Sequence, residues 1–136
     1  MDIDKALDFV REHHRAVLAT RRADGSPQMS PVVVGVDTAG RVVASSRETA
    51  MKTLNLRRNP EVSVLVMNDG FFGEWIQADG TAEVISLPDA MEPLVEYFRS
   101  ISGEHDDWDS YREAMIAERR VLLAITVTRA GPDRSG

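Results

Sequence analysis

Six segments of this sequence alternate apolar and polar residues with a period of two, and tight-turn signals separate several of them. Such segments fold as strands, and short turns between them make antiparallel hairpins. An antiparallel sheet with open edges invites aggregation, so six strands in a chain of 136 residues are expected to close into a barrel. The predicted fold class is mainly β (α+β), a six-stranded antiparallel barrel with flanking helices. The strands are predicted at residues 15–21, 27–37, 41–45, 61–67, 72–87 and 121–128.

Four other stretches repeat apolar residues every three to four positions, which predicts amphipathic helices. Thr49 is the predicted N-cap of the second helix, and Ser110 opens a capping box with Glu113 for the fourth. Asp79 and Gly80, inside the fifth strand, predict a β-bulge rather than another hairpin. The helices are expected at residues 3–13, at 49–59, from 88 onward and at 110–119.

The length is that of one domain, so residues 1–136 are expected to form a single unit. Its ordered core is predicted over about residues 3–128, followed by a polar tail at 130–136. The first residues are acidic rather than a secretory signal, and no apolar run approaches the roughly 18 residues of a membrane span. We therefore expect a cytoplasmic protein without a membrane partner.

Several kinds of chemistry are excluded by what the sequence lacks. It has no cysteine, which removes thiolate metal sites, cysteine nucleophiles and dithiol redox pairs. The motifs of serine hydrolases, zinc peptidases and nucleotide-binding loops are absent, and the acidic segment 104–109 is interpreted as a solvated link between helices. We expect no catalytic side chain and no metal, so any redox chemistry must come from a bound cofactor.

The net charge of −6 argues against a nucleic-acid partner, but one segment is strongly basic. Five cations between residues 41 and 58 oppose one acid, Glu48, a balance of five minus one, or +4. Hydroxyls, helix N–H groups and cations at the end of a strand and the start of a helix suit a phosphate. The alternative is a solvated helix in which Glu48 pairs with Lys52. The five cations, called here the cationic segment, are Arg41, Arg47, Lys52, Arg57 and Arg58.

Two pairs of polar or aromatic residues share a strand face. Gln28 and Ser30 could line a cavity and hydrogen-bond the rim of a planar ring, although such residues are commonly solvated. Trp75 and Gln77 could cover a ring, and the alternative is hydrophobic packing or a dimer interface.

Four segments resemble, in order and spacing, the pyridoxamine 5′-phosphate oxidase-like split β-barrel family: AVLAT at 16–20, DGSPQMS at 24–30, MKTLNLRRNPEVS at 51–63 and GTAEV at 80–84. The likeness covers about residues 3–128. Segments 102–112 and 119–123 resemble in particular the actinobacterial flavin/deazaflavin oxidoreductases of subgroup B, whose members typically use the deazaflavin coenzyme F420.

The resemblance implies an FMN-binding type of split barrel and a homodimer with its cofactor site at the interface. It implies hydride transfer from reduced F420 (F420H2) to a small conjugated or heteroaromatic acceptor. An FMN-dependent enzyme of the pyridoxamine phosphate oxidase type and a non-catalytic F420 carrier are the alternatives. Arg47 could replace an arginine that relatives often carry at the position of Ala50, and Arg57 and Arg58 could extend toward the polyglutamate tail of F420.

The resemblance also implies which residues bind the cofactor. The phosphate is expected at Ser45, Ser46, Arg47, Met51, Lys52 and Thr53. The ring is expected along Gln28, Ser30, Pro31, Val32 and Val33, with Trp75 and Gln77 on the wall supplied by the partner subunit.

Overall fold

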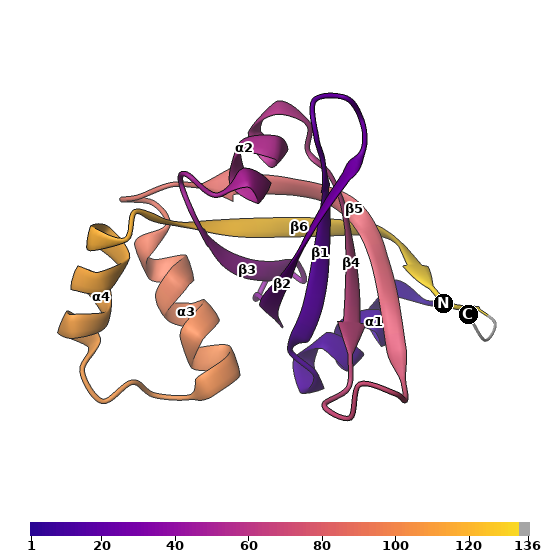
Figure 1. Cartoon of the computed structure of the whole chain (residues 1–136). Coiled ribbons are helices and arrows are strands. Elements are labelled where there is room, and N and C mark those ends of the chain that lie inside the picture. The colour runs from indigo at the N-terminus through magenta and orange to yellow at the C-terminus, as the bar shows by residue number, and fades with distance from the viewer. Residues whose placement is uncertain (134–136) are drawn as a thin grey trace.

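The computed structural model describes residues 1–133, and within them six strands form one closed antiparallel barrel (Figure 1). The order around the barrel is β1-β2-β3-β6-β5-β4. This confirms the predicted fold class. The strands are β1 (Arg15–Arg21), β2 (Pro27–Val36), β3 (Val42–Arg47), β4 (Glu61–Met67), β5 (Trp75–Ile85) and β6 (Arg120–Gly131).

The same residues 1–133 form four helices: α1 (Ile3–Glu12), α2 (Met51–Arg58), α3 (Met91–Ser102) and α4 (Trp108–Ala117). In Figure 1, α3 and α4 lie together on one side of the barrel, whereas α2 and α1 lie near opposite ends of β1. None of the helices in this part of the chain is long and apolar enough to cross a membrane.

Two predicted helix caps are wrong. The N-cap position of α2 is Ala50, not Thr49, and its side chain makes no capping bond. Helix α4 begins earlier than predicted because the Asp107 carboxylate accepts a hydrogen bond from the Ser110 backbone N–H. Asp107 belongs to the acidic segment 104–109, which links α3 to α4 as interpreted from the sequence.

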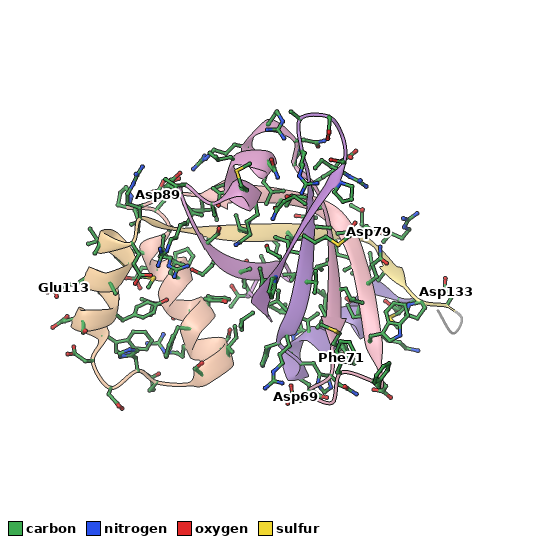
Figure 2. All side chains as sticks on the ribbon, viewed as in Figure 1. Asp69, Phe71, Asp79, Asp89, Glu113 and Asp133 are labelled. Carbon is green, nitrogen blue, oxygen red and sulfur yellow. The ribbon has the colours of Figure 1, made fainter. Side chains whose placement is uncertain are left out.

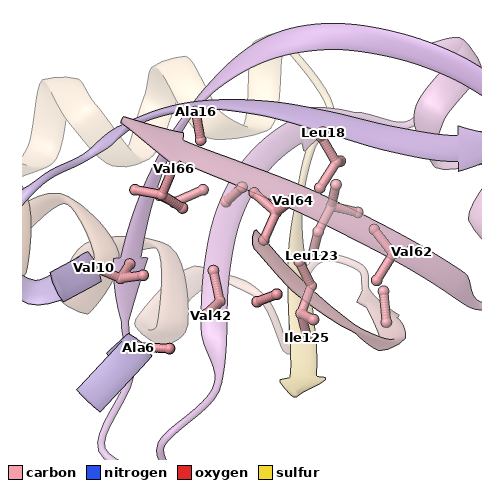
Figure 3. Close-up of a cluster of buried hydrophobic side chains, with 14 of the residues drawn as sticks. Ala6, Val10, Ala16, Leu18, Val42, Val62, Val64, Val66, Leu123 and Ile125 are labelled. Carbon is pink, nitrogen blue, oxygen red and sulfur yellow. The ribbon is translucent and has the colours of Figure 1, made fainter. Parts of the chain in front are cut away.

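The core fills the barrel interior with the apolar side chains of alternate strand positions (Figure 3). Leu18, Val64 and Leu123 are almost completely buried there, and Val10 of α1 joins the same cluster. A fully buried side chain of this size contributes about 1.5 to 3 kcal/mol. The alternating pattern therefore fixes which face of each strand points inward.

Helices α3 and α4 cover the outer face of β3 and β6 with a second apolar cluster. Leu94 of α3 and Met115 of α4 pack with Val43 of β3 and Leu122 of β6. Both faces of β3 and of residues 121–125 in β6 are therefore largely buried, whereas the outer faces of β1, β4 and β5 have no helix over them in Figure 1. This asymmetry leaves one side of the barrel available for contacts.

Strand β5 bends at a bulge and pairs with two neighbours. The β5–β6 register shifts between Asp79 and Gly80, which confirms the predicted bulge. Strand β6 continues past the predicted end at Thr128, because Ala130 and Gly131 pair with β5. The predicted polar tail therefore wrongly included Ala130 and Gly131, and its residues 134–136 lie outside the described residues.

Gly80 permits this bulge because β6 leaves no room for a side chain. A Cβ added at Gly80 would lie 1.9 Å from the Thr126 carbonyl oxygen, which is backbone and cannot rotate away. We predict that Gly80→Ala lowers the free energy of unfolding by about 3 kcal/mol, the upper range for overpacking. Urea denaturation measures this loss. Gly70→Ala, where the nearest atom lies at an ordinary 3.5 Å, is the control, and equal stabilities of the two variants would contradict the prediction.

Candidate functional site

The barrel is split between β2 and β3. These strands pair only where 34–36 face 42–44, although β2 continues to pair with β1 back to Pro27. At the other side of the opening, Ser45, Ser46 and Arg47 pair only with β6. One edge of β2, at residues 27–33, is therefore left without a neighbouring strand.

The parity of the β1–β2 ladder determines which backbone groups lie on this open edge. The Val34 N–H donates to the His14 carbonyl at 2.8 Å, so even-numbered residues of β2 bond to the β1 side. Met29, Pro31 and Val33 consequently turn their backbone groups to the opening. Proline has no N–H and is tolerated on an open edge, so the remaining donors here belong to Met29 and Val33. Such an edge can hydrogen-bond the rim of a planar ligand.

Tyr97 of α3 lies where the β2–β3 ladder stops. The next pair in register would be Val33 opposite Ser45. Instead, the Tyr97 hydroxyl donates to the Val33 carbonyl at 2.7 Å, and the Ser45 backbone N–H is near enough to act on the pKa of this hydroxyl. Burial raises the pKa of Tyr97, and the Ser45 hydrogen bond and the charge of Arg120 only partly oppose this. The hydroxyl thus replaces one direct strand-to-strand hydrogen bond and marks the inner end of the split.

The predicted ring residues lie along this open edge. Ser30 and Val32 alternate with the outward-facing Pro31 and Val33. Ser30 Oγ is buried and has no hydrogen-bond partner within the described chain. Gln28 Oε1 accepts a hydrogen bond from Thr20 Oγ1 at 3.3 Å. The unpartnered Ser30 hydroxyl and the unpaired edge fit a polar ring.

The predicted phosphate residues lie across the opening, at the junction of β3 and α2, but two hydroxyls point into the protein. Thr53 Oγ1 donates to the Arg47 carbonyl at 2.7 Å, and Ser46 Oγ is 2.8 Å from Thr53 Oγ1. Because each hydroxyl has one proton, Ser46 donates to Thr53. Ser46 and Thr53 are buried, so their side chains join β3 to α2. Ser45 is half-buried, and Met51 is 57% exposed.

Most of the cationic segment is already paired. Glu48 bonds Arg57 at 2.8 Å, so the alternative Glu48–Lys52 pair is wrong. Arg58 donates to the Arg21 carbonyl, and Arg47 pairs with Glu118 at 3.2 Å. Arg41 pairs with Asp37 and Glu83.

Lys52 makes no hydrogen bond or ion pair with any residue from 1 to 133. Burial, together with the nearby charge of Arg120, lowers the pKa of its ammonium group. Both effects disfavour the charged form, and an anion placed beside Lys52 would relieve them. No side chain in residues 1–133 caps α2, so its first N–H groups lie free beside Lys52. The junction of β3 and α2 therefore suits an anionic group.

Trp75 and Gln77 lie elsewhere, in a groove of about 1150 Å³ on the outer barrel face. The groove runs over β1, β2, β4 and β5, and none of its lining residues comes from 45–53. Figure 2 shows Phe71 at the tip of the β4–β5 hairpin and Asp79 farther along β5, and both line the groove. Within one copy of the chain, Trp75 and Gln77 are thus not part of the site at Lys52.

Asp79 organises the polar part of this groove. Its carboxylate accepts hydrogen bonds from Ser63 at 2.6 Å, Gln77 at 3.0 Å and Arg129 at 3.0 Å. Burial acts to raise the pKa of Asp79, but these hydrogen bonds outweigh it and leave the pKa below its ordinary value. The Gln77 amide is consequently held in place by Asp79.

The sequence that folds in this way matches a known family over nearly its whole length. The profile of the pyridoxamine 5′-phosphate oxidase family matches residues 3–131. The chain belongs to the pyridoxamine 5′-phosphate oxidase family. Family membership supports an oxidoreductase that uses a flavin or deazaflavin cofactor.

Individual relatives agree with the family. The F420H2-dependent biliverdin reductase of Mycobacterium tuberculosis is 30% identical over 129 residues, which are 93% of this chain and 84% of that protein. Among solved structures, a conserved hypothetical protein from Mycobacterium tuberculosis has a TM-score of 0.77 at 24% identity, covering 100% of this chain and 92% of the other. A structure described as an F420 reductase has a TM-score of 0.69 at 18% identity, covering 91% and 94%. The two structures support the fold.

Two features of the candidate site had no signal in the sequence. Tyr97 reads as one more residue of an amphipathic helix, and nothing local indicates its contact with β2 and β3. Arg120 lies opposite Arg47 in the β3–β6 ladder and close enough to Lys52 to lower its pKa. Only the strand register, which tertiary structure sets, brings these groups to the opening.

We predict that Tyr97→Phe lowers the free energy of unfolding by about 1 to 3 kcal/mol, because the Val33 carbonyl loses its donor and the neighbouring Ser45 N–H loses a polar group. Hydrogen exchange at the Ser45 amide should become faster. Tyr111→Phe is the control, since it removes a hydroxyl that donates to the Leu94 carbonyl inside the helical layer. An unchanged Ser45 exchange rate in Tyr97→Phe would show that the hydroxyl does not bridge the split.

Proposed function

We propose that this protein is an F420H2-dependent oxidoreductase that reduces a small conjugated or heteroaromatic acceptor. The observation that carries the proposal is the unpaired edge of β2, with the orphaned Ser30 hydroxyl, beside the unpaired Lys52. The similarity to a relative that is itself F420H2-dependent supports the choice of F420. That relative reduces biliverdin by name, and for this chain the acceptor is proposed only by class.

In this proposal, the chain's own residues bind and orient the cofactor. Lys52 and the first N–H groups of α2 hold the phosphate, and the backbone of Met29 and Val33 bonds the ring edge. Ser30 offers a hydroxyl from the barrel side. Bound F420H2 supplies the hydride, which is why no nucleophile or acid–base pair is required of the protein. The apolar side chains around the opening exclude water.

The FMN-dependent alternative would use the same edge and the same lysine. It is favoured by the family profile, whose name is that of pyridoxamine 5′-phosphate oxidase. The non-catalytic carrier would bind F420 equally well but transfer no hydride. The preference for F420 or FMN in binding therefore separates the two enzymes, and oxidation of bound F420H2 by an acceptor separates the F420-dependent enzyme from the carrier.

We also propose that two copies of the chain form a homodimer through the groove on the outer barrel face. Its wall includes the apolar side chains of Val17, Leu65 and Met67, and no helix covers these strands in Figure 1. The loop at its end exposes 67% of Phe71 and 89% of Phe72, large apolar surfaces that a partner would cover. A dimer of this kind would let Trp75 and Gln77 complete the cofactor site of the partner subunit.

We predict that the purified protein binds F420 more tightly than FMN, because its phosphate site offers one unpaired cation. Titration of each coenzyme, followed by tryptophan quenching, measures both affinities. FMN binding at least about tenfold tighter than F420 would overturn the choice of cofactor, a difference of about 1.4 kcal/mol. Binding without oxidation of F420H2 by any conjugated acceptor would favour the carrier.

In the same titration, we expect Lys52→Ala to cost about 1.5 to 3 kcal/mol of cofactor binding, the range for a hydrogen bond to a charged group. The control is Lys5→Ala, because Lys5 is an exposed lysine on α1, far along the chain from the site. An unchanged affinity in Lys52→Ala would place the phosphate elsewhere.

The dimer proposal predicts a mass of twice the 15.1 kDa of one chain in light scattering. Leu65 lies in the groove between Val17 of β1 and Gln77 of β5, so Leu65→Arg should produce folded monomers. Ile116→Arg, which changes a 61% exposed residue of α4 outside the groove, should remain dimeric. A monomeric wild-type protein, or a dimeric Leu65→Arg variant, would rule out this interface.

A further inference from the structure

Two arginines face each other directly beside the proposed phosphate site. Arg47 of β3 and Arg120 of β6 are partners in the β3–β6 register, an arrangement in which like charges repel. Glu118, at the end of α4, relieves the repulsion. Its Oε1 atom is 3.2 Å from Arg47 Nη2, 3.1 Å from Arg120 Nε and 2.8 Å from Arg120 Nη2. One carboxylate thus occupies both guanidinium groups.

Lys52 belongs to the same group of charges. The Thr53 hydroxyl, next to Lys52 in α2, bonds the Arg47 carbonyl and fixes the start of the helix against this end of β3. The positive charge of Arg120 acts on Lys52 and helps to lower the pKa of its ammonium group. Glu118 has its own pKa lowered, first by Arg120 and then by Arg47, so it is ionised at neutral pH. Arg47, one of the predicted phosphate residues, is therefore already paired with Glu118, whereas Lys52 stays unpaired among the described residues.

The two candidate cofactors carry different charges at their phosphates. FMN ends in a phosphomonoester, whose charge is about −2 above pH 7. The phosphate of F420 is a diester between the ribityl chain and a lactyl group, and it carries a single negative charge. Coulomb repulsion from a fixed carboxylate is proportional to the charge of the group beside it, so at the phosphate position Glu118 opposes FMN about twice as strongly as F420, whose other charges lie on its polyglutamate tail.

We propose that Glu118 is a specificity-determining residue, whose carboxylate occupies Arg47 and Arg120 and thereby disfavours dianionic phosphomonoesters relative to the singly charged phosphodiester of F420. Glu118 acts through charge and through the two arginines rather than by touching the cofactor. This inference rests on the proposed function for the position of the phosphate at Lys52. It adds a reason why a barrel of this family would prefer F420 to FMN.

The test is Glu118→Gln, which keeps the size of the side chain and removes its charge. Dissociation constants for FMN, riboflavin and F420 are measured at pH 8 and low salt by fluorescence. We expect FMN to bind roughly three- to tenfold more tightly to the variant, within the range for exposed charge pairs and a doubly charged ligand. F420 should gain by a smaller factor, and riboflavin, which has no phosphate, should be unaffected.

Glu92→Gln is the control, because Glu92 also pairs with an arginine, Arg112, but does so between α3 and α4 and in a more exposed setting, at 71% against 34% for Glu118. It should leave all three affinities unchanged. Thermal unfolding of Glu118→Gln without ligand should show a lower Tm, since Arg47 and Arg120 then face each other without a bridging charge. Added FMN should raise the Tm of the variant more than that of the wild type.

The outcomes separate this inference from the proposed function. Equal gains for FMN and F420, no gain for FMN, or an equal gain for riboflavin would overturn the role of Glu118 even if the wild type binds F420. A wild type that fails to bind F420, with FMN binding gained in Glu118→Gln, would overturn the proposed function and leave the role of Glu118 standing. Absence of binding by every ligand to both proteins would overturn both.

Discussion

The hydroxyl of Tyr97, placed between the Val33 carbonyl and the Ser45 N–H, is the contact on which the site depends. Without it, β2 and β3 could continue their ladder in register to the end of β3, and residues 31–33 of the edge would be covered by residues 45–47. With it, the phenol oxygen supplies the Val33 carbonyl with a donor at the point where the β2–β3 ladder stops. The barrel can therefore remain open along one edge while the Val33 carbonyl stays hydrogen-bonded.

Helices α3 and α4 make this contact possible by covering β3 and β6. Their shared apolar cluster fixes α3 against the outer barrel face, which places Tyr97 at the opening. The Tyr111 hydroxyl, bonded to the Leu94 carbonyl, joins the two helices from within, and burial raises the pKa of Tyr111 to about 12. The helical layer thus has a positional role for the site as well as a packing role.

The parts that sequence predicts well are those set by neighbours in the chain. The strand pattern and the bulge at Asp79 and Gly80 depend on local alternation and turn chemistry, and both were predicted from the sequence. The caps at Thr49 and Ser110 were predicted wrongly for different reasons: α2 begins after Ala50 without a side-chain cap, and at α4 the carboxylate of Asp107 accepts from the Ser110 N–H. Lys52 could be found from charge alone, since lysine is rare in this chain.

The rest depends on contacts across long stretches of sequence. Tyr97 lies 64 residues from Val33, and Glu118 lies 71 residues from Arg47, so no local pattern links either pair. The inward direction of the Ser46 and Thr53 hydroxyls likewise follows from how α2 packs on β3. The strand register and the packing of α2 depend on tertiary structure. They give the other members of the cationic segment partners and leave Lys52 unpaired among the described residues.

The most direct test of this account is to follow the backbone amides by NMR while F420 is added. The account predicts the largest shifts and the slowest exchange at Met29 and Val33 on the open edge of β2, together with Lys52 at the start of α2. Changes confined to the outer groove, for example at Leu65 and Thr81, with the amides of Met29 and Val33 unaffected, would contradict the claim that the split is the cofactor site.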